Sequence, residues 1–344
     1  MSVRDWRSLA RSEVDPWYRA EEAWWQRTLA WETAGNWALI EGARTAGTLP
    51  GLLAVDADAS GPAGEGNAGS ASGWAFYLIH RGILQIGALT TRHPHAADQL
   101  LDAILTVAAA ARARGVMAFV PNADAWLETR LTAHGFAVRP FLYLMRPVDG
   151  PAIATGAMPD GGGYRPERLT DVAALLQQAY PGADPARPFA PEGSDEAWLD
   201  YVGQLIAHTG CGVFEPEGSV LVDRPDRSDR PEASAPGRTG APLAGAVLAT
   251  RLAALTGHLA QVAVHPGAQG EGLGPAMVQT AVARLAARGC ARVSLLVAAD
   301  NLRAVRMYRR LGFEESGRFL SAWRAQPTRS TMAACATDGA STLR

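Results

Sequence analysis

The chain has 344 residues, which at roughly 150 residues per domain allows about two domains. Its hydrophobic fraction of 48% and charged fraction of 19% are typical of a globular protein and exclude a disordered one. All 32 basic residues are arginine, which excludes mechanisms built on a lysine, such as a Schiff base or a P-loop. The formal net charge of −2 provides no basic surface for nucleic acid or an anionic membrane.

The cysteines and the apolar runs bear on the compartment. Cys211, Cys290 and Cys335 are too few and too scattered for a disulfide framework or a CxxC metal site, which favours a reducing, cytoplasmic location. The first residues carry charges where a signal peptide needs its apolar region. The longest apolar run, 100–111, is interrupted by Asp102 and is shorter than the about 18 residues of a membrane span. We therefore expect a soluble protein.

Four segments are rich in Pro, Gly, Asp or small polar residues and lack apolar periodicity. Such compositions bury too little apolar surface to offset chain entropy, so we expect loops or disorder there. One of them separates two predicted domains, 1–147 and 164–326. The four segments are 56–73, 148–163, 223–242 and 327–344.

The two halves of the chain show the same order of predicted elements, namely two strands, a long helix, a strand, a second helix and a last strand. Both long helices end in Ala-Arg-Gly, and both second helices lead into Gly-Phe. We interpret the halves as two copies of one α/β unit. The predicted elements, without the last strands, are 74–80, 83–90, 96–114, 116–121 and 125–133 in the first copy, and 244–250, 258–265, 275–288, 292–298 and 302–311 in the second.

A glycine-rich turn separates the second predicted strand of the second copy from its long helix. Residues 269–274 read Gln-Gly-Glu-Gly-Leu-Gly, and Pro275 is predicted at the first helical position. Main-chain N–H groups of such a turn, together with the helix dipole, form an anion site. The dinucleotide fingerprint would require glycine at position 275, so that class is excluded. A plain tight turn without a ligand is the alternative.

Three motifs occur in order around this turn: V-x-V-x-P ending at Pro266, Q-x-x-G-x-G at 269–274, and N-x-x-A-x-x-x-Y at 301–308, followed by L-G-F. Together they resemble the GNAT superfamily of acyl-CoA N-acyltransferases. The resemblance is strong over 247–319 and weaker from about residue 164, and the first copy resembles only a degenerate member. It implies an α/β fold of two tandem GNAT-like domains, each a mixed, splayed sheet flanked by helices.

The resemblance implies acetyl-CoA as co-substrate and no metal. It assigns the main chain of Val262 and Val264 to pairing with the pantetheine arm. Asn301 would hydrogen-bond pantetheine, a role compatible with capping the following helix. Tyr308 would be the general acid that protonates the departing thiolate, and the alternative is a half-buried aromatic on a helix face. The pyrophosphate cradle implied by the resemblance is Gln269, Gly270, Glu271, Gly272, Leu273 and Gly274.

The general base is less clearly marked. Part of the superfamily uses an acidic side chain near the start of the bulged strand, and His258 lies closest to that place here. A solvated hairpin histidine, or a water chain acting as base, is the alternative. The implied reaction is direct attack of an amine on the thioester, with a main-chain N–H stabilising the oxyanion. Cys290, at the end of the long helix, is expected to be inert.

The first copy is predicted to lack the coenzyme A site and to act as a structural partner, in a monomeric pseudo-dimer or a homodimer. A metal at His93 and His95 is not expected, because no third ligand is near. Alignment at the Ala-Arg-Gly and Gly-Phe steps pairs Gln269, Gly272, Gly274, Asn301 and Tyr308 with His95, Asp98, Leu100, Asp124 and Leu131.

The acceptor is not readable from the sequence. The spacing of Trp17, Trp24 and Trp31 predicts a buried helical stripe, with an aromatic acceptor site as the alternative. The segment 181–198 gives no indication of a ligand, although its acidic residues suit either a cationic amine or a solvated helix start. These residues are Glu192, Asp195 and Glu196. The sequence thus predicts an N-acetyltransferase for a small-molecule or peptide amine, or alternatively a non-catalytic acyl-CoA-binding or regulatory module.

Overall fold

The computed structural model describes residues 2–32, 34–56, 71–122, 124–150, 161–208, 211–224 and 241–326. Most of the four predicted disordered segments therefore lies outside the described residues. The edges of three of these segments are described, and there the predicted disorder extended too far. Ala71 begins a strand, Asp223 ends one, and Gly161–Gly162 is a short strand. Across the described chain, no helix combines the length and apolar character needed to cross a membrane.

The chain divides into two compact units, each discontinuous in sequence. Unit 1 comprises Met1–Trp24, Thr33–Arg139 and Phe319–Arg344, and unit 2 comprises Trp25–Glu32 and Pro140–Arg318. Each unit has a mixed sheet with helices on both faces, which confirms the predicted α/β class. The predicted sequence domains, 1–147 and 164–326, stay a prediction about the two copies.

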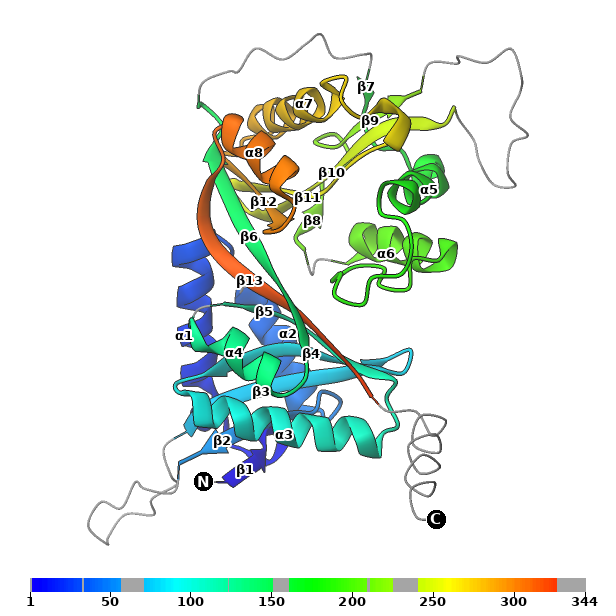
Figure 1. Ribbon diagram of the computed structural model, residues 1–344. Helices are drawn as coiled ribbons and strands as arrows, with labels where there is room; N and C mark the ends of the chain where they lie inside the picture. The colour runs from blue at the N-terminus through cyan, green and yellow to red at the C-terminus, as the bar shows by residue number, and fades with distance from the viewer. Residues whose placement is uncertain are drawn as a thin grey trace, which may run out of the picture. The chain divides into compact units, whose positions relative to one another are not determined.

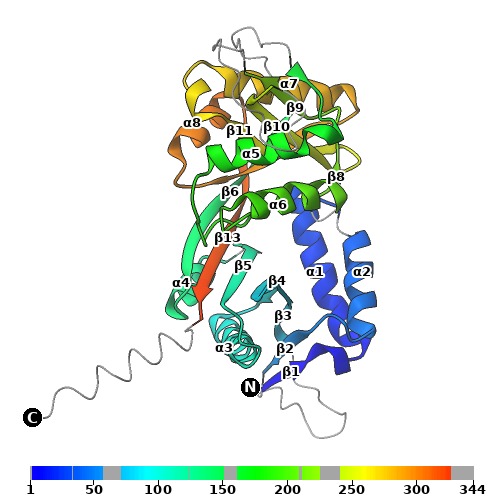
Figure 2. The ribbon, with the colours of Figure 1, turned by 90° about the vertical axis from the view of Figure 1, so that its right-hand side faces the viewer.

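In unit 1, neighbouring strands pair in the order β1-β2-β3-β4-β5, and β4–β5 is the parallel pair. Helix α3 and helices α1 and α2 lie on opposite sides of these strands (Figure 2). The elements are β1 Ser2–Asp5, α1 Arg11–Leu29, α2 Ala34–Thr45, β2 Gly51–Val55, β3 Ala71–His80, β4 Ile83–Thr91, α3 Pro94–Ala110, β5 Gly115–Pro121 and α4 Trp126–Ala133, although α1 continues into unit 2.

In unit 2, the apolar cores on the two faces of the sheet are formed with α5 and α6 on one side and α7 and α8 on the other (Figure 1). Strand β11 pairs with β10 antiparallel and with β12 parallel. The elements are β6 Ala137–Pro147, β7 Gly161–Gly162, α5 Leu169–Ala179, α6 Asp195–Ala207, β8 Val213–Phe214, β9 Val220–Asp223, β10 Leu243–Ala253, β11 Thr256–Val264, α7 Leu273–Ala287, β12 Arg292–Ala298, α8 Leu302–Arg310 and β13 Glu314–Ala325, although β6 begins in unit 1 and β13 ends there.

Both units carry the same irregularity in their central strands. In unit 2, β11–β12 pairing ends at Leu259, and Ala260 is the extra residue of a bulge against β10. In unit 1, β4–β5 pairing ends at Ile86, and Gly87 is the extra residue of a bulge against β3. In each case the parallel strands part directly before the bulge. This shared geometry supports two copies of one fold.

The last strands are exchanged between the copies. Residues 141–147 of β6, which close the first sequence copy, pair with β12 in unit 2. Residues 319–325 of β13, which close the second copy, pair with β5 in unit 1. Phe141 faces Ala298 and Phe319 faces Pro121, so equivalent residues sit in the same register. Each unit therefore completes its sheet with the other copy's strand.

The predicted alignment of the two Ala-Arg-Gly helix ends was wrong by three residues. The residue with positive φ after the long helix is Gly289 in the second copy, at +87°, but Arg112 in the first, at +53°. The following N–H groups, of Cys290 and Ala113, both return to the helix, bonding the carbonyls of Leu285 and Ala108. Arg112, not Gly115, is thus the counterpart of Gly289.

Candidate active site in unit 2

After Leu259, β11 no longer pairs with β12, so its main-chain groups on the side away from β10 have no strand partner there. The carbonyl of Val262 accepts a hydrogen bond from Tyr180 Oη at 3.2 Å, and that of Val264 accepts one from Gln269 Nε2 at 3.3 Å. The N–H of His265, in contrast, bonds the carbonyl of Ala244 in β10. By the alternation of a strand, the N–H groups of Val262 and Val264 share the free side.

The glycine-rich turn is open above its main chain. Gly270 and Gly272 have φ of +92° and +81°, and a Cβ added to either would meet nothing within 4 Å. Helix α7 begins at Leu273 with Gly272 as N-cap, so Pro275 is its third residue. The sequence analysis had placed Pro275 at the first helical position, which was wrong. The first N–H groups of a helix have no partner within it and carry the positive end of its dipole. The turn thus has the geometry of an anion cradle.

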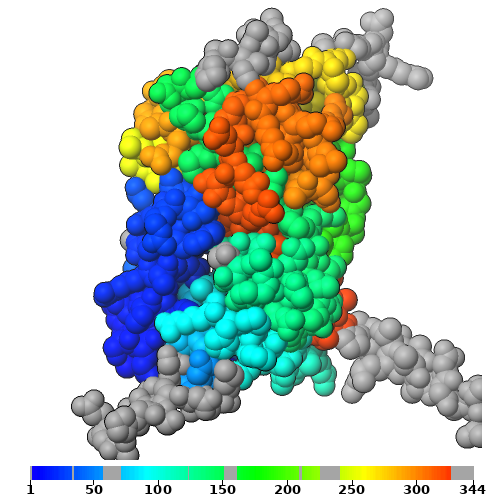
Figure 3. All heavy atoms as spheres, turned by 60° about the vertical axis from the view of Figure 1, so that its left-hand side comes forward, coloured from blue at the N-terminus to red at the C-terminus, as the bar shows by residue number. Residues whose placement is uncertain are grey.

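Arg303 lies beside this turn, a residue that the sequence analysis missed. Its Nη1 donates to Oε1 of Gln269 at 3.2 Å, while Nε2 of Gln269 reaches β11. Figure 3 shows the orange surface of α8 next to the yellow segment that leads into α7. In a chain without lysine, this exposed guanidinium supplies positive charge at the turn. The sequence signal that could have identified Arg303 is its position two residues after Asn301.

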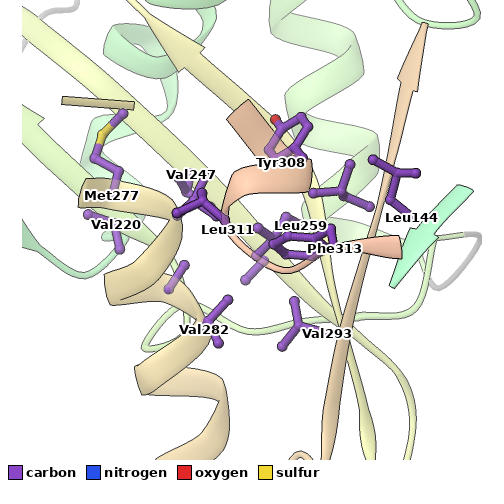
Figure 4. Packing of buried hydrophobic residues seen from close by; sticks show 14 of the residues in the cluster. Leu144, Val220, Val247, Leu259, Met277, Val282, Val293, Tyr308, Leu311 and Phe313 are labelled. Carbon is purple, nitrogen blue, oxygen red and sulfur yellow. The ribbon is translucent and has the colours of Figure 1, made fainter. Parts of the chain in front are cut away.

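Asn301 and Tyr308 lie at the start and on the inner face of α8. Oδ1 of Asn301 accepts the N–H of Ala304 at 3.2 Å, so its helix-capping role is realised. The Tyr308 side chain is buried rather than half-buried, with its ring 5.8 Å from that of Phe313 in an edge-on contact. Figure 4 shows its hydroxyl directed away from the core cluster. Burial raises the pKa of Tyr308 well above its usual value, so the phenol keeps its proton at neutral pH.

His258 is not a solvated hairpin histidine, because only 4% of its surface is exposed. Its Nδ1 lies 2.9 Å from Oγ of Ser294 on β12. Its ring stacks on Tyr143 at 6.1 Å and lies 6.5 Å from the ring of Trp31. Desolvation lowers the pKa of His258 to about 4, so the imidazole is neutral at physiological pH. Its burial is set by segments far away in the sequence.

The tryptophan stripe was only partly predicted. Trp17 and Trp24 lie on α1 within unit 1, but Trp31 lies beyond the end of that helix and belongs to unit 2. Helix α1 ends at Leu29, whose carbonyl accepts a hydrogen bond from Tyr143 Oη at 3.0 Å. Trp31 therefore packs on the His258 side of the sheet instead of extending a helical stripe.

Aromatic side chains from α5, α6 and their connection gather beside β11, and the sequence analysis missed them. Tyr180 stacks on Trp198 at 5.8 Å, and Phe189 lies 5.4 Å from Tyr201. Tyr201 Oη accepts a hydrogen bond from Nε2 of Gln261 at 2.7 Å. Gln261 directly follows the bulge, so this polar pair lies next to the point where β11 and β12 part.

A buried arginine organises the connection between α5 and α6. Arg187 is 5% exposed, and its guanidinium carbon lies 4.8 Å from the centre of the Trp198 ring. Among the acidic residues of this segment, Asp195 accepts a hydrogen bond from Gln177, and Ser194 caps α6. A role for Glu192, Asp195 and Glu196 in binding an amine stays a prediction. The Arg187 guanidinium donates to the carbonyls of Tyr180, Gly182, Phe189 and Ala190.

Unit 1 lacks the turn for a reason other than the predicted one. Strand β4 ends at Thr91 and α3 begins at Pro94, so only Arg92 and His93 connect them. His93 itself caps α3 through Nδ1, and its Nε2 lies 3.3 Å from Asp56. The pairing of Gly272 and Gly274 with Asp98 and Leu100 was therefore wrong, as was that of Gln269 with His95, because the loop is absent rather than substituted. Within the described chain, no group of three metal-ligating side chains gathers.

The comparisons with known proteins agree with this geometry. Residues 175–313 match the sequence model of the Acetyltransferase (GNAT) family. The chain is 37% identical over 161 residues to a mycothiol acetyltransferase of Streptomyces scabiei, covering 40% of this chain and 48% of that protein. It is 35% identical over 159 residues to one from Beutenbergia cavernae, covering 42% and 49%. The chain thus spans about half the length of these curated relatives.

The fold likeness extends further along the chain. The crystal structure of a GCN5-related N-acetyltransferase from Sphaerobacter thermophilus matches with a TM-score of 0.54 at 20% identity, covering 80% of this chain and 81% of that one. The fold is therefore that of GNAT proteins. The chain thus carries a region that matches the GNAT family, and this matched region lies within unit 2.

Proposed function

We propose that the chain is an N-acetyltransferase that moves the acetyl group of acetyl-CoA to a primary amine of a small molecule or peptide. The observation that carries the proposal is the open glycine turn at the start of α7, next to the parted end of β11, within the region matched by the GNAT family. The names of the relatives in Streptomyces and Beutenbergia make mycothiol-related amines the first acceptors to screen.

The proposed roles follow the positions of the residues. N–H groups of 270–274 bind the pyrophosphate, and Arg303 adds positive charge beside it. The main chain of Val262 and Val264 holds the pantetheine amides, next to Asn301. Tyr180 shares the Val262 carbonyl, which has a second lone pair for a ligand. A main-chain N–H of the parted strand stabilises the oxyanion.

The proposed chemistry is a direct transfer. The amine nitrogen bonds to the thioester carbon, the carbon–sulfur bond breaks, and one proton moves from nitrogen to sulfur overall. Tyr308, which is protonated at neutral pH, donates to the leaving sulfur. His258, which is neutral, accepts the amine proton directly or through water. Cys290 takes no part, because it is buried and burial raises the pKa of its thiol.

Release of free thiol from acetyl-CoA across a panel of amines tests the proposal. With an identified acceptor, Tyr308→Phe should lower kcat by about 100-fold or more, the usual contribution of a positioned acid. Tyr164→Phe, at another buried tyrosine of unit 2, is the control and should leave kcat unchanged. Thermal stabilisation by acetyl-CoA with no turnover on any amine would favour a non-catalytic acyl-CoA-binding module. Unchanged kcat in Tyr308→Phe would remove its acid role.

A further inference from the structure

The imidazole of His258 is held by a small buried network. Ser294, its partner on β12, has no exposed surface, and Tyr143 is equally buried. The backbones of His258 and Ser294 are direct neighbours in the last stretch of parallel pairing before β11 and β12 part. A neutral imidazole has one N–H and one lone pair, so its contact with Ser294 fixes which nitrogen carries the proton.

The protons of the network can be assigned by counting donors and acceptors. The Tyr143 hydroxyl donates to the carbonyl of Leu29 at 3.0 Å, so its oxygen can only accept from Ser294, with which it also interacts. Ser294 Oγ lies 3.3 Å from the Gly257 carbonyl, a second acceptor for its single proton. The Ser294 proton thus has two acceptors other than His258. That proton can serve only one of the two, so the network makes the most hydrogen bonds when Nδ1 of His258 donates to Ser294 Oγ.

We propose that Ser294 is a positioning residue that holds His258 in the tautomer with its proton on Nδ1 and its lone pair on Nε2. Two neighbouring rings restrain the imidazole, since Tyr143 stacks on it with an interplanar angle of 12° and Trp31 is tilted against it at 30°. The other tautomer would set the Nδ1 lone pair against the Ser294 oxygen, whose single proton already has two other acceptors. Nε2 is then the only nitrogen of His258 able to accept a proton.

A second buried hydroxyl lies on the other side of His258. Thr250 of β10 is its direct cross-strand neighbour, and residues paired in this way project from the same face of the sheet. Thr250 is fully buried and its Oγ1 has no hydrogen-bond partner. Such a group pairs with water or with a ligand. In the proposed tautomer, Nε2 and Thr250 Oγ1 are thus an acceptor and a donor on the same face of the sheet.

The tautomer itself does not depend on the proposed function, although its use as the acceptor of the amine proton does. Histidine-selective ¹⁵N labelling of the full chain, without acetyl-CoA or amine, reports it directly. Long-range ¹H–¹⁵N correlation at pH 7, with the His258 signals assigned by their loss in His258→Gln, should show a pyrrole-type Nδ1 and a pyridine-type Nε2. A pyrrole-type Nε2 in the wild-type chain would overturn the proposal.

Variants at Ser294 separate positioning from packing. Ser294→Ala should shift His258 toward the other tautomer and lower kcat by roughly tenfold or more with little change in KM. Ser294→Thr keeps the hydroxyl and should retain the wild-type tautomer. Ser321→Ala, at a buried serine on a strand of unit 1, is the control and should change neither. A wild-type tautomer in Ser294→Ala contradicts the proposal. A confirmed tautomer in a chain that acetylates no amine contradicts only the proposed function.

Discussion

The two units keep the same parted strands but connect them to the long helix differently. In unit 2, β11 and α7 are separated by 265–272, which include the two left-handed glycines. In unit 1, β4 and α3 are separated by Arg92 and His93 alone. The bulge and the splay belong to the fold and survive in both copies. The anion cradle depends on extra loop residues, which only one copy has. A ligand site can therefore be lost by shortening one turn while the sheet is unchanged.

The largest expected effect comes from the substitution His258→Gln. It gives position 258 the residue found at the equivalent position of unit 1, which is Gln85. Because the pKa of His258 is about 4 in the folded chain and 6.5 as a free side chain, protonation favours unfolding. Its contribution to the free energy of unfolding is complete above pH 6.5 and is lost as the pH falls to 4, by about 3 kcal/mol. In urea titrations, His258→Gln should lose acid sensitivity over this window.

An exposed histidine is the control for this measurement. His208 lies at the end of α6, and His208→Gln should retain the acid sensitivity of the wild-type chain. An equal loss of stability between pH 7 and pH 4 in His258→Gln and the wild type would contradict the burial of this imidazole.

The second prediction sharpens the difference between the connecting turns. Gly272→Ala places a side chain at φ +81° in the turn, and Gly289→Ala places one at φ +87° after α7. Both sites are open, so the two substitutions should lower the free energy of unfolding by similar amounts, about 1–2 kcal/mol each. Only Gly272→Ala should weaken acetyl-CoA binding, by roughly 10- to 100-fold, because it disturbs charge-assisted N–H contacts. Isothermal titration of both variants measures this, and equal affinities would refute the cradle.

The smallest expected effect concerns the charge beside the turn. Arg303→Gln keeps a donor for Gln269 but removes the exposed cation. We expect acetyl-CoA affinity to fall by a few-fold and its dependence on salt to become flatter, since exposed charge pairs contribute about 0.2–1 kcal/mol. Arg309→Gln, at an exposed arginine near the other end of α8, is the control. An unchanged salt dependence in Arg303→Gln would show that this cation does not face the ligand.

The sequence predicted what local patterns determine. The strand at 292–298 was predicted with its observed bounds, Arg292–Ala298, and the glycine turn was located before α7. The burial of His258 could not be predicted, since Trp31 and Tyr143 reach it from distant segments. The aromatic group around Tyr201 was missed for the same reason, because its members meet only through tertiary packing.

The strand exchange also lay beyond local patterns. Residues 141–146 and 319–324 both begin with Phe-Leu and end with Arg, and they take equivalent registers. Either strand therefore fits either sheet by its alternation of side chains. The choice is set by chain connectivity and by packing around the strand, such as the contact of Gly115 with Trp323, neither of which a pattern in one strand encodes.

The exchange sets an order of events during synthesis of the chain. The strand that completes unit 1 is translated after every residue of unit 2, so β5 has no neighbour on that side until then. A nascent or truncated chain that stops before residue 319 would expose this strand edge, which is a template for aggregation. A stop codon directly after unit 2 would thus leave unit 2 complete but remove the strand that completes unit 1.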